Sequence, residues 1–240
     1  MNYNIYKKMK EKNKNTDSEL NSLSYEEALK IDERTYCQYY FSLIKKKQSI
    51  LFSFYPNKDY NSQIIKSFLF FFYYSSDITI NALFFNDDTM HKIYNDSGKF
   101  NLSYQLPQII YSYLISSGIN FIIEYLSLTD EIIISIKSIK ILGIHKKKKI
   151  IKNIKIKFCC FFIITFILLL IFGYYISCFC CIYENTQIHL IKDSLLSLAL
   201  SSIIPFCKCL IPGIFRIPAL RNKKGNKSSM YKLSRILEYF

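Results

Sequence analysis

The sequence predicts an all-α integral membrane protein with four transmembrane helices and amphipathic helices on the cytosolic face. Residues 158–182 form an apolar run without a single charge. Three more apolar segments, near 67–85, 104–126 and 191–210, alternate with strongly polar segments. Lysine and arginine concentrate in every second connecting segment, as expected when spans alternate between two sides of a membrane.

The run 158–182 is the clearest span. A helix of this length rises roughly 37 Å at about 1.5 Å per residue, which exceeds the ~30 Å of bilayer hydrocarbon. Its centre, 161–172, is almost entirely Phe, Ile and Leu. Each such residue contributes about 0.3–0.6 kcal/mol to insertion. Core helices of soluble proteins rarely exclude polar residues for so long, so we predict a transmembrane helix.

The composition sets limits on the protein class. The chain has 240 residues, half of them apolar, and a formal net charge of +14. This length allows one membrane domain and a modest soluble arm. The positive charge suits anionic lipid at the cytosolic face. The sequence contains no zinc-finger, RNA-recognition or helix-turn-helix pattern, so no nucleic acid partner is predicted.

The segment before the first span is polar. Residues 1–22 are rich in lysine and are expected to be a disordered tail. Ser24 and Glu27 fit a capping box, which predicts a helix to about Ile44 within a cytosolic or interfacial segment, 23–64. Lysines 45–47 prevent 39–54 from spanning. We expect this stretch to lie in the interface, with tyrosines at headgroup level and lysines toward anionic lipid.

The first predicted span, 67–85, carries a polar pair. Asp77 and Asn81 are four residues apart and therefore share one helix face. An intramembrane carboxylate is a candidate functional site. The alternative is a polar residue that packs against a neighbouring helix. Both interpretations are kept at this stage.

A short polar loop, 86–103, follows the first span. Its charged residues Asp87, Asp88, His91 and Lys92 are candidate contacts for a partner. Asn95 and Asn101 begin Asn-x-Ser triplets and are candidate glycosylation sites. The loop lacks the full pattern of a calcium-binding EF-hand.

The second predicted span, 104–126, is interrupted by Pro107 near its start. Asn120 and Glu124 are again four residues apart, close to its far end. The segment 128–157 holds nine lysines among isoleucines. It is predicted to be a basic cytosolic loop that forms a solvated or lipid-facing amphipathic helix.

The fourth predicted span, 191–210, follows a short loop, 183–193. Ser194, Ser197 and Ser201 are spaced to line one packing face, and Pro205 is expected to kink the helix. The stretch 214–220 is expected to lie along the surface. Arg216 and the basic cytosolic tail 221–240 complete the chain.

Orientation follows from the charges. The segment around Lys45, the loop 128–157 and the tail are basic, whereas 86–103 and 183–193 are not. The positive-inside rule therefore places both termini in the cytosol, with the four-span domain 65–220 in a eukaryotic endomembrane or the plasma membrane.

Signatures of catalysis are missing from the sequence. It has no glycine-rich phosphate loop, no His-Glu-x-x-His and no Gly-x-Ser-x-Gly. The three histidines lie in segments on both predicted sides, and Asp77 and Glu124 are the only acidic residues in the predicted apolar spans. We predict no enzyme, no cofactor and no metal. Seven of the eight cysteines lie in apolar segments, as small lipid-compatible residues, acylation sites or, near Cys178, a disulfide partner.

Several stretches resemble a recurring module. They read SYEEAL (24–29), RTYCQYY (34–40), FFNDDTMHKIY (84–94) and IFRIPAL (214–220). Over roughly residues 19–222 the chain resembles an uncharacterised family of multi-span transmembrane proteins from AT-rich single-celled eukaryotes of the protist or ciliate type. The resemblance implies a membrane module without a known activity and makes the loop segments candidates for interaction.

Two functional hypotheses follow. In the first, the protein is a membrane anchor, scaffold or subunit of a membrane complex, with a membrane-protein partner or a second copy of itself. In the second, copies assemble into a channel or carrier whose polar path is lined by Asp77, Asn81 and Asn120. Four spans are few for a carrier that acts alone, which favours the first hypothesis.

Overall fold

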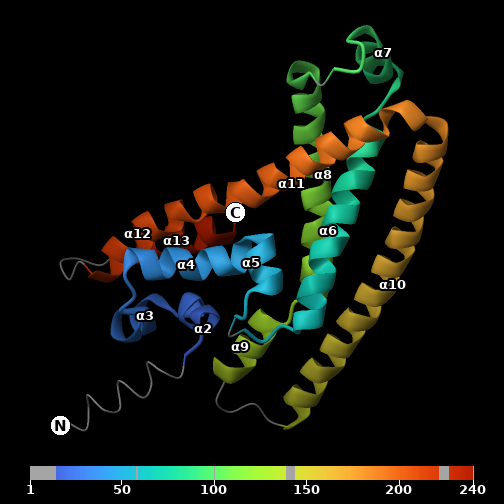
Figure 1. The fold of residues 1–240 in the computed structure, drawn as a ribbon. Coiled ribbons are helices and arrows are strands. Elements are labelled where there is room, and N and C mark those ends of the chain that lie inside the picture. The colour runs from blue at the N-terminus through green and yellow to red at the C-terminus, as the bar shows by residue number, and fades with distance from the viewer. Residues whose placement is uncertain (1–14, 58, 100, 139–143, 222–226, 240) are drawn as a thin grey trace. The chain divides into compact units, whose positions relative to one another are not determined.

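A computed structural model describes residues 15–57, 59–99, 101–138, 144–221 and 227–239, and within these ranges all regular elements are helices (Figure 1). The all-α prediction is therefore confirmed. The predicted tail up to residue 14 and residues 139–143 and 222–226 of the basic segments lie outside the described ranges. The chain divides into two compact units, of which unit 1 comprises 1–61, 129–141 and 204–240 and unit 2 comprises 62–128 and 142–203.

Unit 2 contains the long apolar helices. Its elements are α6 (Gln63–Leu83), α7 (Asp87–Asn95), α8 (Leu102–Ser127), α10 (Ile144–Ile182), the 3₁₀ turn η1 (Glu184–Thr186) and most of α11 (Gln187–Lys208). Helices α6, α8 and α10 pack against one another. Aromatic side chains join α6 to α10, with ring centroids 5.6 Å apart for Phe68 and Phe161 and 5.9 Å apart for Phe72 and Phe172.

Three helices of the described residues, or four if one bent pair is a single span, are long and apolar enough to cross a membrane. Helix α8, the helix α10 and the run Glu184–Arg221 are each long and apolar enough to cross a bilayer. Helix α6 is long and apolar enough to cross a bilayer only when it is taken together with α7. The axes of the two helices are bent by 82° relative to each other. The charged residues of α6 are Lys66 and Asp77, and both are buried. Pro107 does not break the second predicted span, because it lies within the continuous helix α8.

Unit 1 is built from short helices of three separate chain segments. They are α2 (Asp17–Ser22), α3 (Tyr25–Ile31), α4 (Tyr36–Lys47), α5 (Ser49–Phe54), α9 (Asp130–Ser138), α12 (Leu210–Arg221) and α13 (Ser228–Tyr239). Helix α12 packs on α13, α4 and α3, and α9 packs on α2. The predicted basic loop and tail therefore contain folded helices.

Capping boxes define the N-terminal helices of unit 1. The predicted box of Ser24 and Glu27 begins α3. A second box, of Thr16 and Glu19, begins α2. The prediction of a disordered tail through residue 22 was therefore wrong for residues 17–22, which form this helix. A third box at Thr35 begins α4, and the predicted continuous helix to Ile44 is therefore two helices. The first turn of a helix has backbone N–H groups without a partner inside the helix, and each capping box accepts hydrogen bonds from some of them. These bonds stabilise even a short helix.

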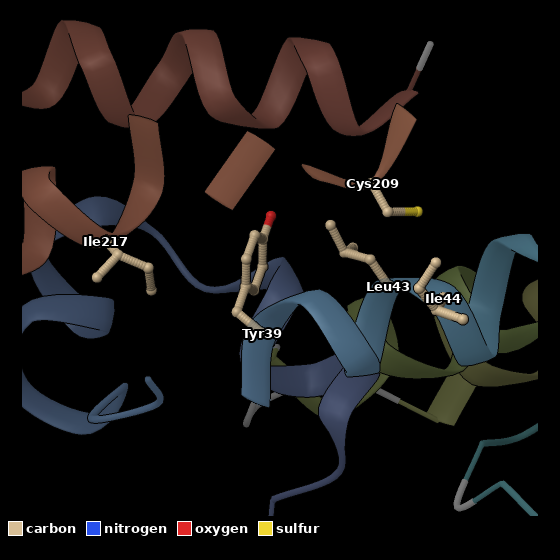
Figure 2. Close-up of a cluster of buried hydrophobic side chains, with 5 residues drawn as sticks. All are labelled: Tyr39, Leu43, Ile44, Cys209 and Ile217. Atoms are coloured by element: carbon tan, nitrogen blue, oxygen red, sulfur yellow. The ribbon is translucent and has the colours of Figure 1, made fainter. Parts of the chain in front are cut away.

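The apolar core of unit 1 lies between α4 and α12. Figure 2 shows Tyr39, Leu43 and Ile44 of α4 beside Cys209 and Ile217. Tyr39 is fully buried, so its predicted position at headgroup level was wrong.

Helix α12 also lies against the other tyrosines of α4. The Tyr36 hydroxyl donates to the Leu210 carbonyl at 2.8 Å. A Cβ atom on Gly213 would lie 2.6 Å from Cε2 of Tyr36, so glycine permits this approach. One side of the stretch 214–220 therefore packs against other helices of unit 1, whereas the sequence had predicted that this stretch lies along the surface.

An ion pair lies inside unit 1. The Arg216 side chain is fully buried, and its Nη2 lies 2.9 Å from Oδ2 of Asp32, which is 1% exposed. Nη2 also donates to the Leu20 carbonyl at 2.8 Å. The guanidinium carbon lies 4.9 Å and 4.8 Å from the ring centroids of Tyr39 and Tyr231. Arg216, predicted to belong with the exposed basic residues, thus joins α12 to α3, α4 and α13.

Arg34 completes the surroundings of Asp32. Its Nε and Nη2 each donate to the Asp32 carboxylate at 2.8 Å. Burial alone would raise the pKa of the Asp32 carboxyl, but the hydrogen bonds and charge of Arg34, and then of Arg216, outweigh burial and hold the pKa below its ordinary value.

Replacing Arg216 with alanine is expected to destabilise unit 1 by about 3–5 kcal/mol, because the substitution leaves the Asp32 charge buried with only part of its compensation. Near-UV circular dichroism of the full chain in detergent during thermal unfolding measures the change. The matched control is Arg221→Ala on the exposed end of the same helix, which should unfold like the wild type. Equal stability of both variants would show that the ion pair is dispensable.

Acid should remove the contribution of the ionised Asp32 carboxylate to the stability of the folded state. Because its folded pKa is lowered, this contribution is complete above the unfolded value of about 3.9 and is lost as the pH falls through the folded pKa. Asp32→Asn should therefore lower the unfolding temperature strongly at pH 7 and much less near pH 3. A difference between the two proteins that does not depend on pH would contradict this assignment.

Candidate functional site

Polar side chains recur at four-residue intervals along α8. Residues at this spacing share one helix face. The matching face of α6 carries Tyr73, Asp77 and Asn81, also four residues apart. We call this contact the α6–α8 ladder. Its α8 members are Gln108, Ser112, Ser116, Asn120 and Glu124.

Hydrogen bonds connect the two sides of the α6–α8 ladder. The Tyr73 hydroxyl donates to Glu124 Oε1 at 2.6 Å. Ser116 is hydrogen-bonded to the Asp77 carboxyl group, and the Ser112 hydroxyl donates to Asn81 Oδ1. The order of these bonds shows that α6 and α8 run antiparallel.

The last member of the ladder reaches the end of α6. Gln108 Nε2 donates to the Phe84 carbonyl at 2.6 Å and to Thr89 Oγ1 at 2.7 Å. The ladder therefore extends over the full length of the contact and onto α7.

The structure brings the predicted polar residues into one contact. Asp77 and Asn81 are buried against α8, and Glu124 lies on the same interface. The amide oxygen of Asn120 is buried without a hydrogen-bond partner in the described residues. Asp77 and Glu124 have different partners, Ser116 and Tyr73, so they do not form a carboxylate dyad.

The chemistry of the ladder is that of helix association. No described lysine, arginine or histidine forms an ion pair with Asp77, and its one side-chain partner is a hydroxyl. Among the described residues, no group of three His, Cys, Asp or Glu side chains is placed to hold a metal ion. All eight cysteines are free thiols, including Cys178. Within a bilayer, hydroxyl, amide and carboxyl groups of this kind hydrogen-bond between helices.

The candidate loop contact lies on helix α7, where the sequence had predicted an irregular loop. Asn86 caps this helix by accepting the Thr89 N–H at 2.9 Å. Ile93 faces inward and packs with Phe85, Phe179 and Leu190. The candidate contact residues all lie on the exposed side, and they are Asp87, Asp88, His91 and Lys92.

The two candidate glycosylation sites differ in their surroundings. Asn95 is exposed at the end of α7. Asn101 caps α8, accepting the Ser103 N–H at 3.1 Å and donating to Asp96 Oδ2 at 3.2 Å. Asn95 is therefore the more accessible acceptor in the folded chain.

Sequence reasoning missed part of the buried polar surface. It identified Asn120 and Glu124, and it took Ser116 as part of a small-residue surface for helix contact, but it missed Ser112, although the four-residue spacing was a readable signal. It also assigned 183–193 to a loop and counted Asp77 and Glu124 as the only acidic residues within the spans. The structure places Asp193 in α11, where it is 1% exposed.

No family model, no curated protein and no solved structure matches this chain. The functional argument therefore depends on the geometry of this chain alone. The resemblance to a multi-span family stays a prediction.

A double-mutant cycle measures the strength of the ladder. Tyr73→Phe and Glu124→Ala should couple by about 0.6 kcal/mol, and by no more than ~1.7 kcal/mol, as interhelical hydrogen bonds in membranes do. Unfolding of the full chain by titrated detergent gives the free energies. Tyr111→Phe, on the exposed side of α8, is the control and should not couple to Glu124→Ala. A coupling energy of zero for Tyr73 would mean that this hydrogen bond does not stabilise the pair.

Proposed function

We propose that this chain is an integral membrane protein that serves as an anchor, scaffold or subunit of a membrane complex and has no catalytic activity. One observation carries the proposal. Parts of all three segments that the positive-inside rule assigns to the cytosol gather in one compact unit, because unit 1 combines 1–61, 129–141 and 204–240, while the lysine-rich remainder of the loop, 142–157, belongs to unit 2. A membrane domain that carries such a folded unit suits the attachment of partners.

Contacts on the other predicted side support the same topology. Residues 86–103 and 183–193 meet within unit 2, where Met90 and Ile93 pack in one cluster with Tyr183 and Leu190. A hydrogen bond between His189 and the Gly98 backbone joins the same two segments. The two segments assigned to the other side of the membrane therefore contact one another.

The exposed surface of unit 1 suits anionic lipid. Phe41, Ile50 and Phe54 are large apolar side chains with half or nearly half of their surface exposed. The Lys45 ammonium group lies 5.2 Å from the Tyr55 ring centroid, next to Lys46 and Lys47. Apolar side chains beside clustered lysines are typical of segments that lie in the interface of an anionic membrane.

The channel or carrier alternative is less well supported. Asn81 is bonded to Ser112 and Asp77 to Ser116, so their polar groups are used between two helices of one chain. A path formed between copies of the chain would need these groups on an outer face. We therefore place the alternative second.

The exposed face of α7 is the proposed contact for a membrane-protein partner. Its charged side chains can bind a partner without disturbing the buried Thr89 and Ile93. His91→Glu with Lys92→Glu should release a subunit that co-purifies with the full chain in mild detergent, measured by particle mass and composition. Lys148→Glu with Lys149→Gln, near the start of α10 where both lysines are exposed, is the charge-matched control and should retain the subunit.

The same purification tests the alternative. A particle that contains only copies of this chain, together with liposome ion flux that Asp77→Leu abolishes, would overturn the anchor proposal in favour of the channel. A foreign subunit that stays bound to the α7 variant would overturn only the assignment of its contact surface.

A further inference from the structure

A second row of polar side chains lies on α11, away from the α6–α8 ladder. His189, Asp193 and Ser197 are four residues apart, and Ser194 adjoins them on the same buried face. Their exposed fractions are 5%, 1%, 0% and 1% respectively. The opposite face of α11 carries exposed Ile191, Ile188 and Leu195. We call Asp193, Ser194 and Ser197 the α11 oxygen cluster.

The oxygen atoms of this cluster have no hydrogen-bond partners. Asp193 Oδ1, Ser194 Oγ and Ser197 Oγ are all buried and unpaired in the part of the chain that the structure describes. Several serines elsewhere in the long helices bond to their own backbone, although the Ser76 hydroxyl of α6 is also buried and unpaired among the described residues. Ser117 donates to the Leu114 carbonyl at 2.9 Å, and Ser201 donates to the Leu198 carbonyl at 2.9 Å. Such back-bonding is the usual solution for a helical hydroxyl, so the open hydroxyls beside Asp193 need another explanation.

The charge of Asp193 also lacks compensation. No described basic side chain forms an ion pair with it, and the neighbouring Lys192 is exposed. An ionised carboxylate in apolar surroundings is costly unless a positive charge or several hydrogen-bond donors accompany it. A ligand that supplies one positive charge and accepts oxygen ligands would satisfy the carboxylate and both hydroxyls together.

We propose that the α11 oxygen cluster binds a monovalent metal cation, for which sodium is the best fit. Carboxylate and hydroxyl oxygens are hard ligands and select hard cations. The single carboxylate of Asp193 balances one positive charge. A divalent ion would leave one positive charge uncompensated on the buried face of α11.

The helix geometry permits a shared ion. Side chains four residues apart have Cβ atoms about 5–6 Å from each other, so one ion can contact both Asp193 and Ser197. Ser194 adds a third oxygen from the adjacent position. The lack of a described group of three His, Cys, Asp or Glu side chains is compatible with this site, which uses a single carboxylate.

The site is independent of the proposed anchor function, because it concerns the integrity of α11 and no partner. A bound cation would neutralise Asp193 and hold together the buried face of this helix. Removing the cation should therefore loosen the folded chain whatever the chain attaches to.

The test is thermal unfolding of the full chain in detergent, with sodium chloride compared with N-methylglucamine chloride at equal concentration. A ligand that binds only the folded state raises the unfolding temperature until binding saturates. We expect sodium to raise the unfolding temperature of the wild type by several degrees, with a saturating dependence on concentration. Asp193→Asn should abolish this sodium-dependent shift, and Ser197→Ala should at least halve it.

Two matched variants separate this site from general salt effects. Asp77→Asn removes another buried acid of unit 2, and Ser201→Ala removes a hydroxyl that is bonded to its own helix. Both should keep the full sodium-dependent shift.

Three results would overturn the proposal. They are equal unfolding temperatures of the wild type in the two salts, a shift that Asp193→Asn retains, or a stability that rises on acidification without any response to sodium. The last result would mean that a proton neutralises Asp193. If Asp193→Asn does not fold, Ser194→Ala and Ser197→Ala decide the question, because loss of two hydroxyls should leave the fold intact while weakening the sodium response.

Discussion

The buried ion pair of Arg216 and Asp32 is the contact on which the organisation of unit 1 depends. The two residues are 184 positions apart, and every predicted membrane helix lies between them. Arg216 is fully buried and needs the Asp32 carboxylate, which Arg34 also contacts, so the two ends of the chain meet at this point. Tyr39 and Tyr231 then stack on the guanidinium and bring α4 and α13 to the same point. The ion pair therefore joins the part of unit 1 that precedes the long apolar helices to the part that follows them.

The membrane helices are held by a different balance of forces. Lipid tails are as apolar as leucine, so burial of apolar surface contributes little to association between transmembrane helices. The α6–α8 ladder supplies hydrogen bonds at four-residue spacing instead, and ring contacts such as Phe72 with Phe172 connect α6 to α10. The hydroxyls of Ser112 and Ser116 are small enough to let two helices approach while still bonding across the gap.

Features encoded locally were predictable from the sequence, and long-range features were not. The apolar run of α10 and the capping box at Ser24 were readable because helix length and caps depend on neighbouring residues. The break before α4 had a readable signal, the Thr35 capping box, but the apolar spacing that continues across it obscured the signal. Tyr39 was misplaced because nothing near it in the sequence points to Arg216. Asp193 was missed because its polar neighbours resemble a loop.

Contacts at the ends of α6 and α8 bear on whether α6 can be counted as a span. Asn61 Oδ1 accepts the N–H groups of Thr129 at 2.9 Å and Asp130 at 3.2 Å, so the chain returns after α8 to the point where it left before α6. If α8 crosses the bilayer, the chain must cross once more between Asn61 and Leu102. Helix α6, with 21 residues or roughly 31 Å, is the element of that interval long enough to do so. Its buried Asp77 and Asn81 are compatible with this crossing, because hydroxyls of α8 hydrogen-bond to the Asp77 carboxyl group and to Asn81 Oδ1 inside the helix pair. The polar residues that lower the apolar character of α6 are thus the residues that join it to α8.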